Sequence, residues 1–143
     1  MTVSIKKDAS LDDIVFKSGS TEVMRISSAG TLSVNSGYGA TNTNATATGN
    51  ITLDFEAYQN FVLTLTGNIT LDNPTTESVG QSGFIVLKQD ATGGRTVSLG
   101  SQFKTSNGAG VALSSGASAV DVVPYLVSGD GEILLGKVQL AFG

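Results

Sequence analysis

Two pairs of acidic residues have a spacing that could support chemistry. Asp54 and Glu56 are two residues apart and would project from one face of a strand, and paired carboxylates hydrolyse glycosides when they flank a sugar. Asp130 and Glu132 offer oxygen ligands to a hard cation. However, the chain has no Trp to line a sugar cleft, and its carboxylates are sparser than those of a calcium loop. We therefore interpret the first pair as a solvated strand end and the second as part of a hairpin turn.

Two short glycine-containing sequences resemble phosphate-binding loops only superficially. They are Gly93-Gly94-Arg95 and Gly136-Lys137. A phosphate-binding P-loop needs Gly-x4-Gly-Lys-Ser/Thr at the start of a helix, and neither sequence has this pattern. We interpret residues 93–95 as a tight hairpin turn and Lys137 as a lysine on an edge strand.

The chain contains no His and no Cys, which removes most of the common catalytic groups. There is no imidazole base, no thiol nucleophile, and no zinc–thiolate or iron–sulfur site. The serines lack a histidine base that would activate a hydroxyl as a nucleophile. We therefore expect no enzymatic activity, no cofactor, and no catalytic or metal-binding residue.

Charge and hydropathy restrict the partners of the protein. The 143 residues include 8 basic and 12 acidic side chains, for a net charge of −4, so nucleic acid is not an expected partner. The longest apolar runs, residues 84–87 and 122–127, are far shorter than the roughly 20 residues that cross a bilayer. The first residues lack the apolar segment of a secretory signal. We expect no membrane partner and synthesis in the cytoplasm.

Alternation of apolar and polar residues dominates the chain from residue 50 onward. Phe61, Leu63 and Leu65, for example, alternate with residues that would face outward. Clusters of Gly, Asn, Asp and Ser separate such segments at short intervals, as in antiparallel sandwiches. Strands are predicted at residues 50–55, 60–66, 68–72, 83–89, 94–99, 111–114, 119–127 and 132–141. We predict an all-β protein whose main domain is an antiparallel, jelly-roll-like sandwich of about eight strands.

The N-terminal part of the chain has a different character. Residues 1–37 contain short strand-like pieces at 2–5, 14–17, 22–27 and 31–34, and we predict a β-rich arm here, a linker at 38–49 and the sandwich at 50–143. A segment of under about 40 residues does not usually form its own core, so another chain should bury its apolar side chains. The residues expected to dock on other chains are Ile5, Val15, Phe16, Val23, Met24, Arg25, Ile26 and Leu32.

Two stretches resemble bacteriophage virion proteins. Residues 13–30 are similar to a sequence motif of tail-fibre and head-fibre shafts. The similarity lies in Phe16-Lys17 followed by Glu22-Val23-Met24-Arg25-Ile26, and Ser20 stands near a position that is often Gly. The second stretch has four blocks in order, residues 60–71, 80–86, 89–96 and 119–123. These blocks resemble a β-domain of phage virion proteins. The resemblance implies a structural protein of the virion that is usually trimeric.

These observations favour one function and leave alternatives. The favoured hypothesis is a homotrimeric capsid decoration (cement) protein that binds the major capsid protein through residues 1–37 and stabilises the shell. Such a protein would be assembled in the cytoplasm of the host bacterium. The alternatives are a small tail-fibre, head-fibre or adaptor protein docked on another virion protein, and a carbohydrate-binding sandwich. Apolar area buried between subunits, at about 25 cal/mol per Å2, would resist the pressure of packaged DNA.

Overall fold

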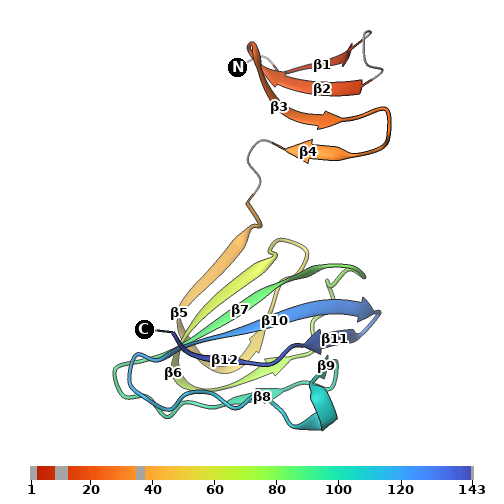
Figure 1. Cartoon of the computed structure of the whole chain (residues 1–143). Coiled ribbons are helices and arrows are strands. Elements are labelled where there is room, and N and C mark those ends of the chain that lie inside the picture. The colour runs from red at the N-terminus through yellow and green to blue at the C-terminus, as the bar shows by residue number, and fades with distance from the viewer. Residues whose placement is uncertain (1–2, 9–12, 35–37, 143) are drawn as a thin grey trace. The chain divides into compact units, whose positions relative to one another are not determined.

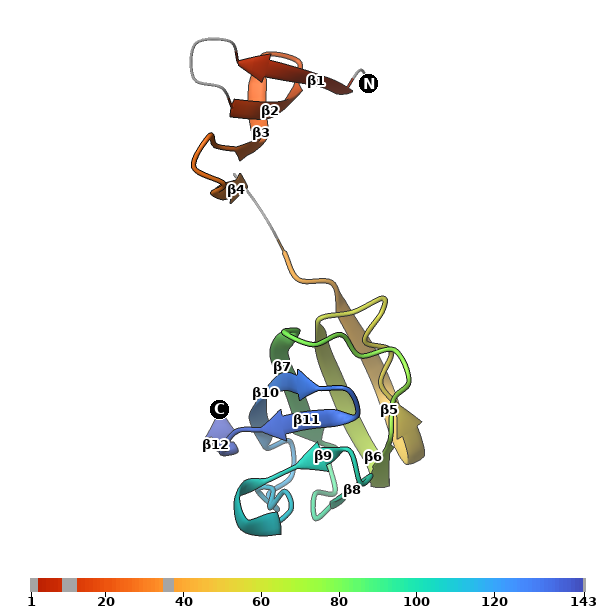
Figure 2. The same cartoon turned by 90° about the vertical axis from the view of Figure 1, so that its right-hand side faces the viewer.

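The computed structural model describes residues 3–8, 13–34 and 38–142. The chain divides into two compact units, Met1–Tyr38 and Gly39–Gly143, each built on its own β-sheet (Figures 1 and 2). Within the described residues, no helix has the length and apolar character needed to cross a membrane. The prediction of an all-β protein is confirmed.

The N-terminal unit is a sheet of four strands that follow one another in space as in the sequence (Figure 1). All three pairs of neighbouring strands are antiparallel. Gly19 and Gly30 have φ angles of +64° and +80°, so these glycines supply the left-handed backbone of the turns after the second and third strands. The strands are β1 (Val3–Asp8), β2 (Asp13–Ser18), β3 (Thr21–Ile26) and β4 (Leu32–Val34).

The C-terminal unit is one eight-stranded sheet in which six strands follow the order β5-β6-β7-β10-β11-β9. Strand β8 pairs with β6, and β12 pairs with β10. Figures 1 and 2 show that this sheet curls, so that its inner face encloses the core. The elements are β5 (Thr41–Thr52), β6 (Asn60–Asp72), β7 (Ser82–Gln89), β8 (Val97–Leu99), β9 (Phe103–Lys104), the 3-10 turn η1 (Ser106–Gly108), β10 (Val120–Gly129), β11 (Glu132–Leu135) and β12 (Gln139–Phe142).

The strand pairing is mixed, whereas the sequence pattern predicted antiparallel pairs throughout. Strand β6 pairs in parallel with β5, β7 and β8, and β9 pairs in parallel with β11. The pairs that β10 makes with β7, β11 and β12 are antiparallel. Clusters of Gly, Asn and Asp mark a change of chain direction, but they do not show whether the chain returns beside the strand or crosses over it.

Two connections make the parallel pairs. Residues 53–59 bring the chain back from the end of β5 to the start of β6, and residues 73–81 do the same between β6 and β7. Parallel neighbours require such crossovers, because a hairpin turn reverses the strand direction. Leu53, Phe55 and Pro74 are buried, so the connections also cover the inner face of the sheet.

Strand β6 runs without interruption through Gly67, where the composition predicted a turn between two strands. A Cβ atom at Gly67 would lie 2.3 Å from the Oγ1 atom of Thr48 on β5. The glycine therefore permits close approach of β5 rather than a reversal of the chain. Residues 49–54 and 67–72 both read Gly-Asn-Ile-Thr-Leu-Asp, and these two copies lie side by side in parallel, with Ile51 opposite Leu71.

Strand β5 begins at Thr41, inside the stretch 38–49 that was expected to be a linker. This segment lacks Leu, Ile and Val because most of its side chains are exposed on an edge strand. Its β-branched Thr residues suit an extended backbone, and Ala47 alone in the segment is fully buried. Low apolar content thus reflects an edge position here.

The core of the C-terminal unit receives side chains from strands β5 to β11 and from residues 53–59. Phe55, Phe61 and Tyr125 form its aromatic centre, with the ring centroids of Phe55 and Tyr125 5.2 Å apart in an edge-to-face arrangement. The Tyr125 hydroxyl donates a 2.6 Å hydrogen bond to the Gln59 carbonyl. Burial raises the pKa of Tyr125 to about 12, so this hydroxyl remains a donor at neutral pH.

Pro124 lies in the central strand β10, although proline usually occupies edge strands or bulges. Its carbonyl accepts a 2.8 Å bond from the Gly136 amide, at the break between β11 and β12. A Cβ atom at Gly136 would lie 2.7 Å from Pro124 Cγ. Pro124 has no N–H to donate, and it lies where β10 faces the gap between its partner strands β11 and β12.

Asp121 is a buried carboxylate, 1% exposed, that joins three segments. Its Oδ2 accepts a 2.7 Å bond from the Ser114 amide, and its Oδ1 accepts bonds from the Ser114 hydroxyl at 2.8 Å and the Ala141 amide at 2.9 Å. Because the side chains of β12 are all exposed, polar contacts such as these hold that strand to the sheet.

We predict that Asp121→Ala lowers the free energy of unfolding of the C-terminal unit by about 3 kcal/mol. The substitution leaves the amides of Ser114 and Ala141 without their acceptor in a buried site. Urea denaturation followed by circular dichroism measures the change. The exposed Asp130 is the matched control, and Asp130→Ala should stay within about 0.5 kcal/mol of the wild type. Equal losses in the two variants would contradict the role given to Asp121.

Candidate functional site

The N-terminal sheet presents an apolar face to solvent. Strand register places its members opposite one another, Phe16 with Met24 and Ile14 with Ile26, for example, and residues paired in this way share a face. Leu32 is 59% exposed. We call this surface the N-terminal apolar face; it comprises Ile14, Phe16, Met24, Ile26, Leu32 and Val34.

The opposite face of this sheet carries an ion-pair cluster around Arg25. Its guanidinium pairs with Asp13 and, at 2.6 Å, with Glu22. These bonds raise the pKa of Arg25, and the hydrogen bond from Arg25 lowers the pKa of Glu22. Asp13 also accepts a 2.8 Å bond from the Ser28 amide. Val15 lies opposite Arg25 on this face and is 2% exposed.

The structure thus separates the eight residues that were expected to dock. Phe16, Met24, Ile26 and Leu32 lie together on the N-terminal apolar face, whereas Val15 is buried and Arg25 is ion-paired on the other face. Val23 lies at the register shift between β2 and β3 and is exposed. Ile5 pairs along the backbone with Phe16, and its side chain is outside the described part of the structure.

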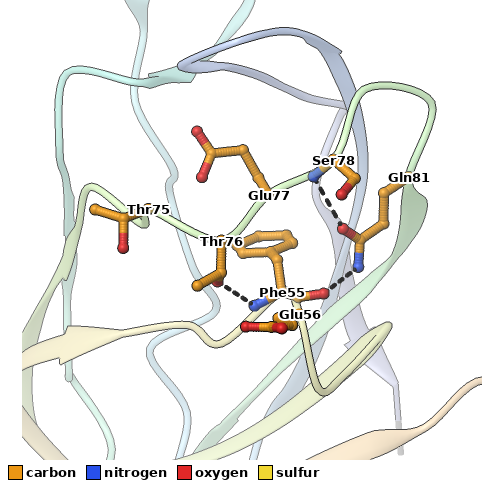
Figure 3. Close-up of a pocket in the computed structure, with 7 residues that line it drawn as sticks. All are labelled: Phe55, Glu56, Thr75, Thr76, Glu77, Ser78 and Gln81. Carbon is orange, nitrogen blue, oxygen red and sulfur yellow. Dashed lines mark hydrogen bonds between the residues drawn. The ribbon is translucent and has the colours of Figure 1, made fainter.

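In the C-terminal unit, a hollow of about 660 Å3 lies between residues 54–59 and the 73–81 connection. Figure 3 shows how hydrogen bonds join its walls. The Phe55 amide donates to Thr76 Oγ1 at 3.0 Å, and Gln81 Nε2 donates to the Phe55 carbonyl at 2.9 Å. These bonds fasten the second crossover to the first. The hollow is lined by Phe55, Glu56, Thr75, Thr76, Glu77, Ser78 and Gln81.

Asp54, one of the candidate carboxylates, has structural partners. Asp54 follows the end of β5, and its Oδ1 accepts bonds of 3.1 Å from the amides of Glu56 and Ala57, which closes a turn. Glu77 accepts a 3.2 Å bond from the Gly131 amide. Among the residues that the structure describes, no group of three or more acidic, His or Cys side chains is placed to hold a metal ion.

The turn at residues 130–132 joins β10 to β11, as predicted. Gly129 pairs with Glu132, and Gly131 has a φ angle of +64°. The Ser128 hydroxyl donates a 2.7 Å bond to Glu132 Oε1. This pair of carboxylates therefore belongs to an antiparallel hairpin.

Residues 90–96 form a loop stabilised by Asp90, rather than the tight hairpin that the sequence predicted. The strands on either side, β7 and β8, both run parallel to β6. Asp90 Oδ1 accepts bonds from the amides of Thr92 and Gly93, and Asp90 Oδ2 pairs with Arg95 at 2.8 Å. The amide groups and the guanidinium that a phosphate would need are therefore already bonded within the loop.

Gln89 holds the two ends of this loop together. Its side chain donates to the Arg95 carbonyl at 2.9 Å and accepts from the Arg95 amide at 2.8 Å. A side-chain amide thus takes the place of a backbone strand partner. Gly93 packs against the next loop, because a Cβ atom there would lie 2.5 Å from the Ser115 carbonyl oxygen.

A second apolar surface, not anticipated from the sequence, lies on the outer side of the C-terminal sheet. Phe84 on β7, Leu126 on β10 and Leu134 on β11 are exposed there. The apolar runs at residues 84–87 and 122–127 were the signal for it, because strands that are apolar at every position are typical of sheets covered on both faces.

Comparison with known proteins identifies the family. Residues 48–132 match the family model described as "Putative phage tail fibre C-terminal domain", and this match covers more than half of the chain. The chain belongs to this family. No curated protein matches the chain, and no solved structure matches it. The protein is a structural component of the phage virion, with a β-domain like those of tail fibres, and the four blocks noted in the sequence all lie within the matched residues.

We predict that Arg95→Gln raises the pKa of Asp90 toward its ordinary value of 3.8, because the bond from Arg95 is the largest cause of its lowering. A carboxyl group with a lowered pKa stabilises the fold above pH 3.8, and this stabilisation is lost as the pH falls through the folded-state pKa. Substitution should therefore lower the urea midpoint above pH 3.8 and leave little difference in stronger acid.

Carboxyl NMR titration measures the pKa directly. The control is Arg25→Gln, which removes a similar ion pair from the other unit and should leave the Asp90 titration unchanged. An Asp90 pKa that is the same with Gln and with Arg at position 95 would contradict the assignment.

Proposed function

We propose that this protein is a short tail appendage of the virion, in which the N-terminal sheet docks on the particle and the C-terminal domain forms the outer part. The observation that supports this proposal is the contrast between the two units. The C-terminal unit has a large core of its own, whereas the N-terminal unit exposes an apolar face. The match to a tail-fibre C-terminal domain favours the tail over the capsid.

The docking role follows from the energetics of the N-terminal unit. Within its described residues, Val15 is the single buried hydrophobic side chain. A unit of this size rarely holds together on such a core, and burial of an exposed Ile or Leu contributes about 1.5–3 kcal/mol. Covering the N-terminal apolar face therefore stabilises both the sheet and its attachment. We propose that another virion protein supplies the surface.

Capsid decoration is the second candidate. A homotrimeric cement protein would use the same residues 1–37 to bind the major capsid protein and would stabilise the shell. The resemblance of residues 13–30 to both head-fibre and tail-fibre proteins supports either placement, whereas the family match favours the tail. For both candidates we propose three copies per assembly and assembly in the host cytoplasm.

Deletion of residues 1–37 tests the docking role. We expect the truncated protein to keep the circular dichroism signal of the C-terminal domain and to lose binding to phage particles that lack the protein. Immunogold labelling of intact particles with the full chain should mark the tail. A truncated protein that still binds would contradict docking by the N-terminal unit, and label confined to the head would favour capsid decoration.

A pair of point substitutions in the full chain isolates the N-terminal apolar face. Ile26→Glu introduces a charge on this face, and Ser33→Glu introduces the same charge opposite Arg25 on the other face. We expect Ile26→Glu to weaken particle binding at least about tenfold, because the lost burial exceeds 1.4 kcal/mol. Ser33→Glu should bind like the wild type in the same sedimentation assay. Equal binding by the two variants would contradict this use of the face.

A further inference from the structure

The outer side of the C-terminal sheet carries a continuous apolar surface. Val62, Val86 and Val122 lie in one row across β6, β7 and β10, and Phe84 is paired with Pro124 in the next row. Leu126 is paired with Leu134 of β11. We call this surface the outer apolar face; it comprises Val62, Phe84, Val86, Val122, Pro124, Leu126 and Leu134.

This face is open to solvent although its strands are apolar on both sides. Phe84 is 50% exposed, Leu126 44% and Leu134 40%, whereas their neighbours Ile85 and Val127 point into the core. Strands whose two faces are both apolar are typical of sheets covered on both sides. The inner side is covered by the core, so the outer side requires a partner.

The outer apolar face has both protruding side chains and hollows. A hollow of about 460 Å3 is bounded by Phe84, Pro124 and Tyr125 together with the polar residues Gln59, Asn60 and Ser82. Another hollow, of about 300 Å3, is bounded by Pro124, Leu126 and Leu134. Pro124 and Tyr125 line both hollows, so the hollows adjoin each other on one surface. A face that carries both protruding side chains and hollows can pack against the same face of neighbouring copies around a symmetry axis.

The charge distribution also suits contact between identical faces. On the outward positions of β7, β10 and β11, the charged side chains are Lys88 and Glu132, which lie at opposite ends of the face. The central positions are neutral. Symmetry brings like residues of identical subunits together near the axis, and like charges there would repel. This face avoids such repulsion.

We propose that copies of this chain associate through the outer apolar face, so that each C-terminal domain covers the face of another. This assignment concerns the C-terminal unit and does not depend on where the N-terminal sheet docks. The N-terminal apolar face serves attachment to the particle, and the outer apolar face serves association between subunits.

Single-cysteine variants of the full chain test the assignment, since the natural chain has no cysteine. Phe84→Cys and Leu126→Cys place a thiol on the outer apolar face. Thr75→Cys places one in the exposed crossover between β6 and β7 and is the matched control. Circular dichroism is used to check that each variant is folded, and light scattering is used to measure how many chains associate in solution.

We expect cysteines at 84 and 126 to react with a maleimide at least tenfold more slowly than the cysteine at 75, and all three to react alike in urea. Mild oxidation should give covalent dimers from the variants at 84 and 126 and none from the control. Equal reactivity in the folded protein, or a wild-type chain that is monomeric at tens of micromolar, would overturn the proposal. Protection that appears only after phage particles are added would assign the face to another virion protein instead.

Discussion

Parallel pairing around β6 is the constraint on which the rest of the C-terminal domain depends. This strand buries Phe61, Leu63, Leu65, Ile69 and Leu71 on one face and pairs in parallel with three other strands. Parallel partners oblige the chain to cross back over the sheet, and the crossovers deliver Leu53 and Phe55 to the core. A single curled sheet can therefore enclose a core with little help from a second layer.

The two units differ in how they cover their apolar side chains, and the proposed function rests on this difference. The C-terminal sheet covers its inner face completely and leaves its outer face open. The N-terminal sheet buries Val15 on the face that carries the Arg25 ion pairs and leaves its other face open. Each unit thus presents one apolar sheet face to the surroundings. In the proposed assembly, these two faces would hold the subunits together and attach them to the particle by independent contacts.

Residue alternation was sufficient to predict an all-β fold and most of the core strands, because burial of one strand face fixes a period of two. It could not reveal the parallel pairing. The residue alternation and the turn residues are the same whether the next strand returns through a hairpin or through a crossover. Gly67 appeared to be a turn because close approach of Thr48 also demands glycine. Among the residues expected to dock, the structure places Val15 and Arg25 on the opposite face from Phe16 and Met24, which composition does not reveal, and the docking role of all of them stays a prediction.

The Gln89 side chain has a consequence for how the domain could diversify. Its side-chain amide closes residues 90–96 into a separate loop, after which β8 replaces β7 as the partner of β6. The length of this loop does not affect the strand pairing on either side of it. Residues inserted at its exposed tip near Ala91 would leave the sheet undisturbed. The domain therefore contains a natural position for displaying variable peptide on the surface of a particle.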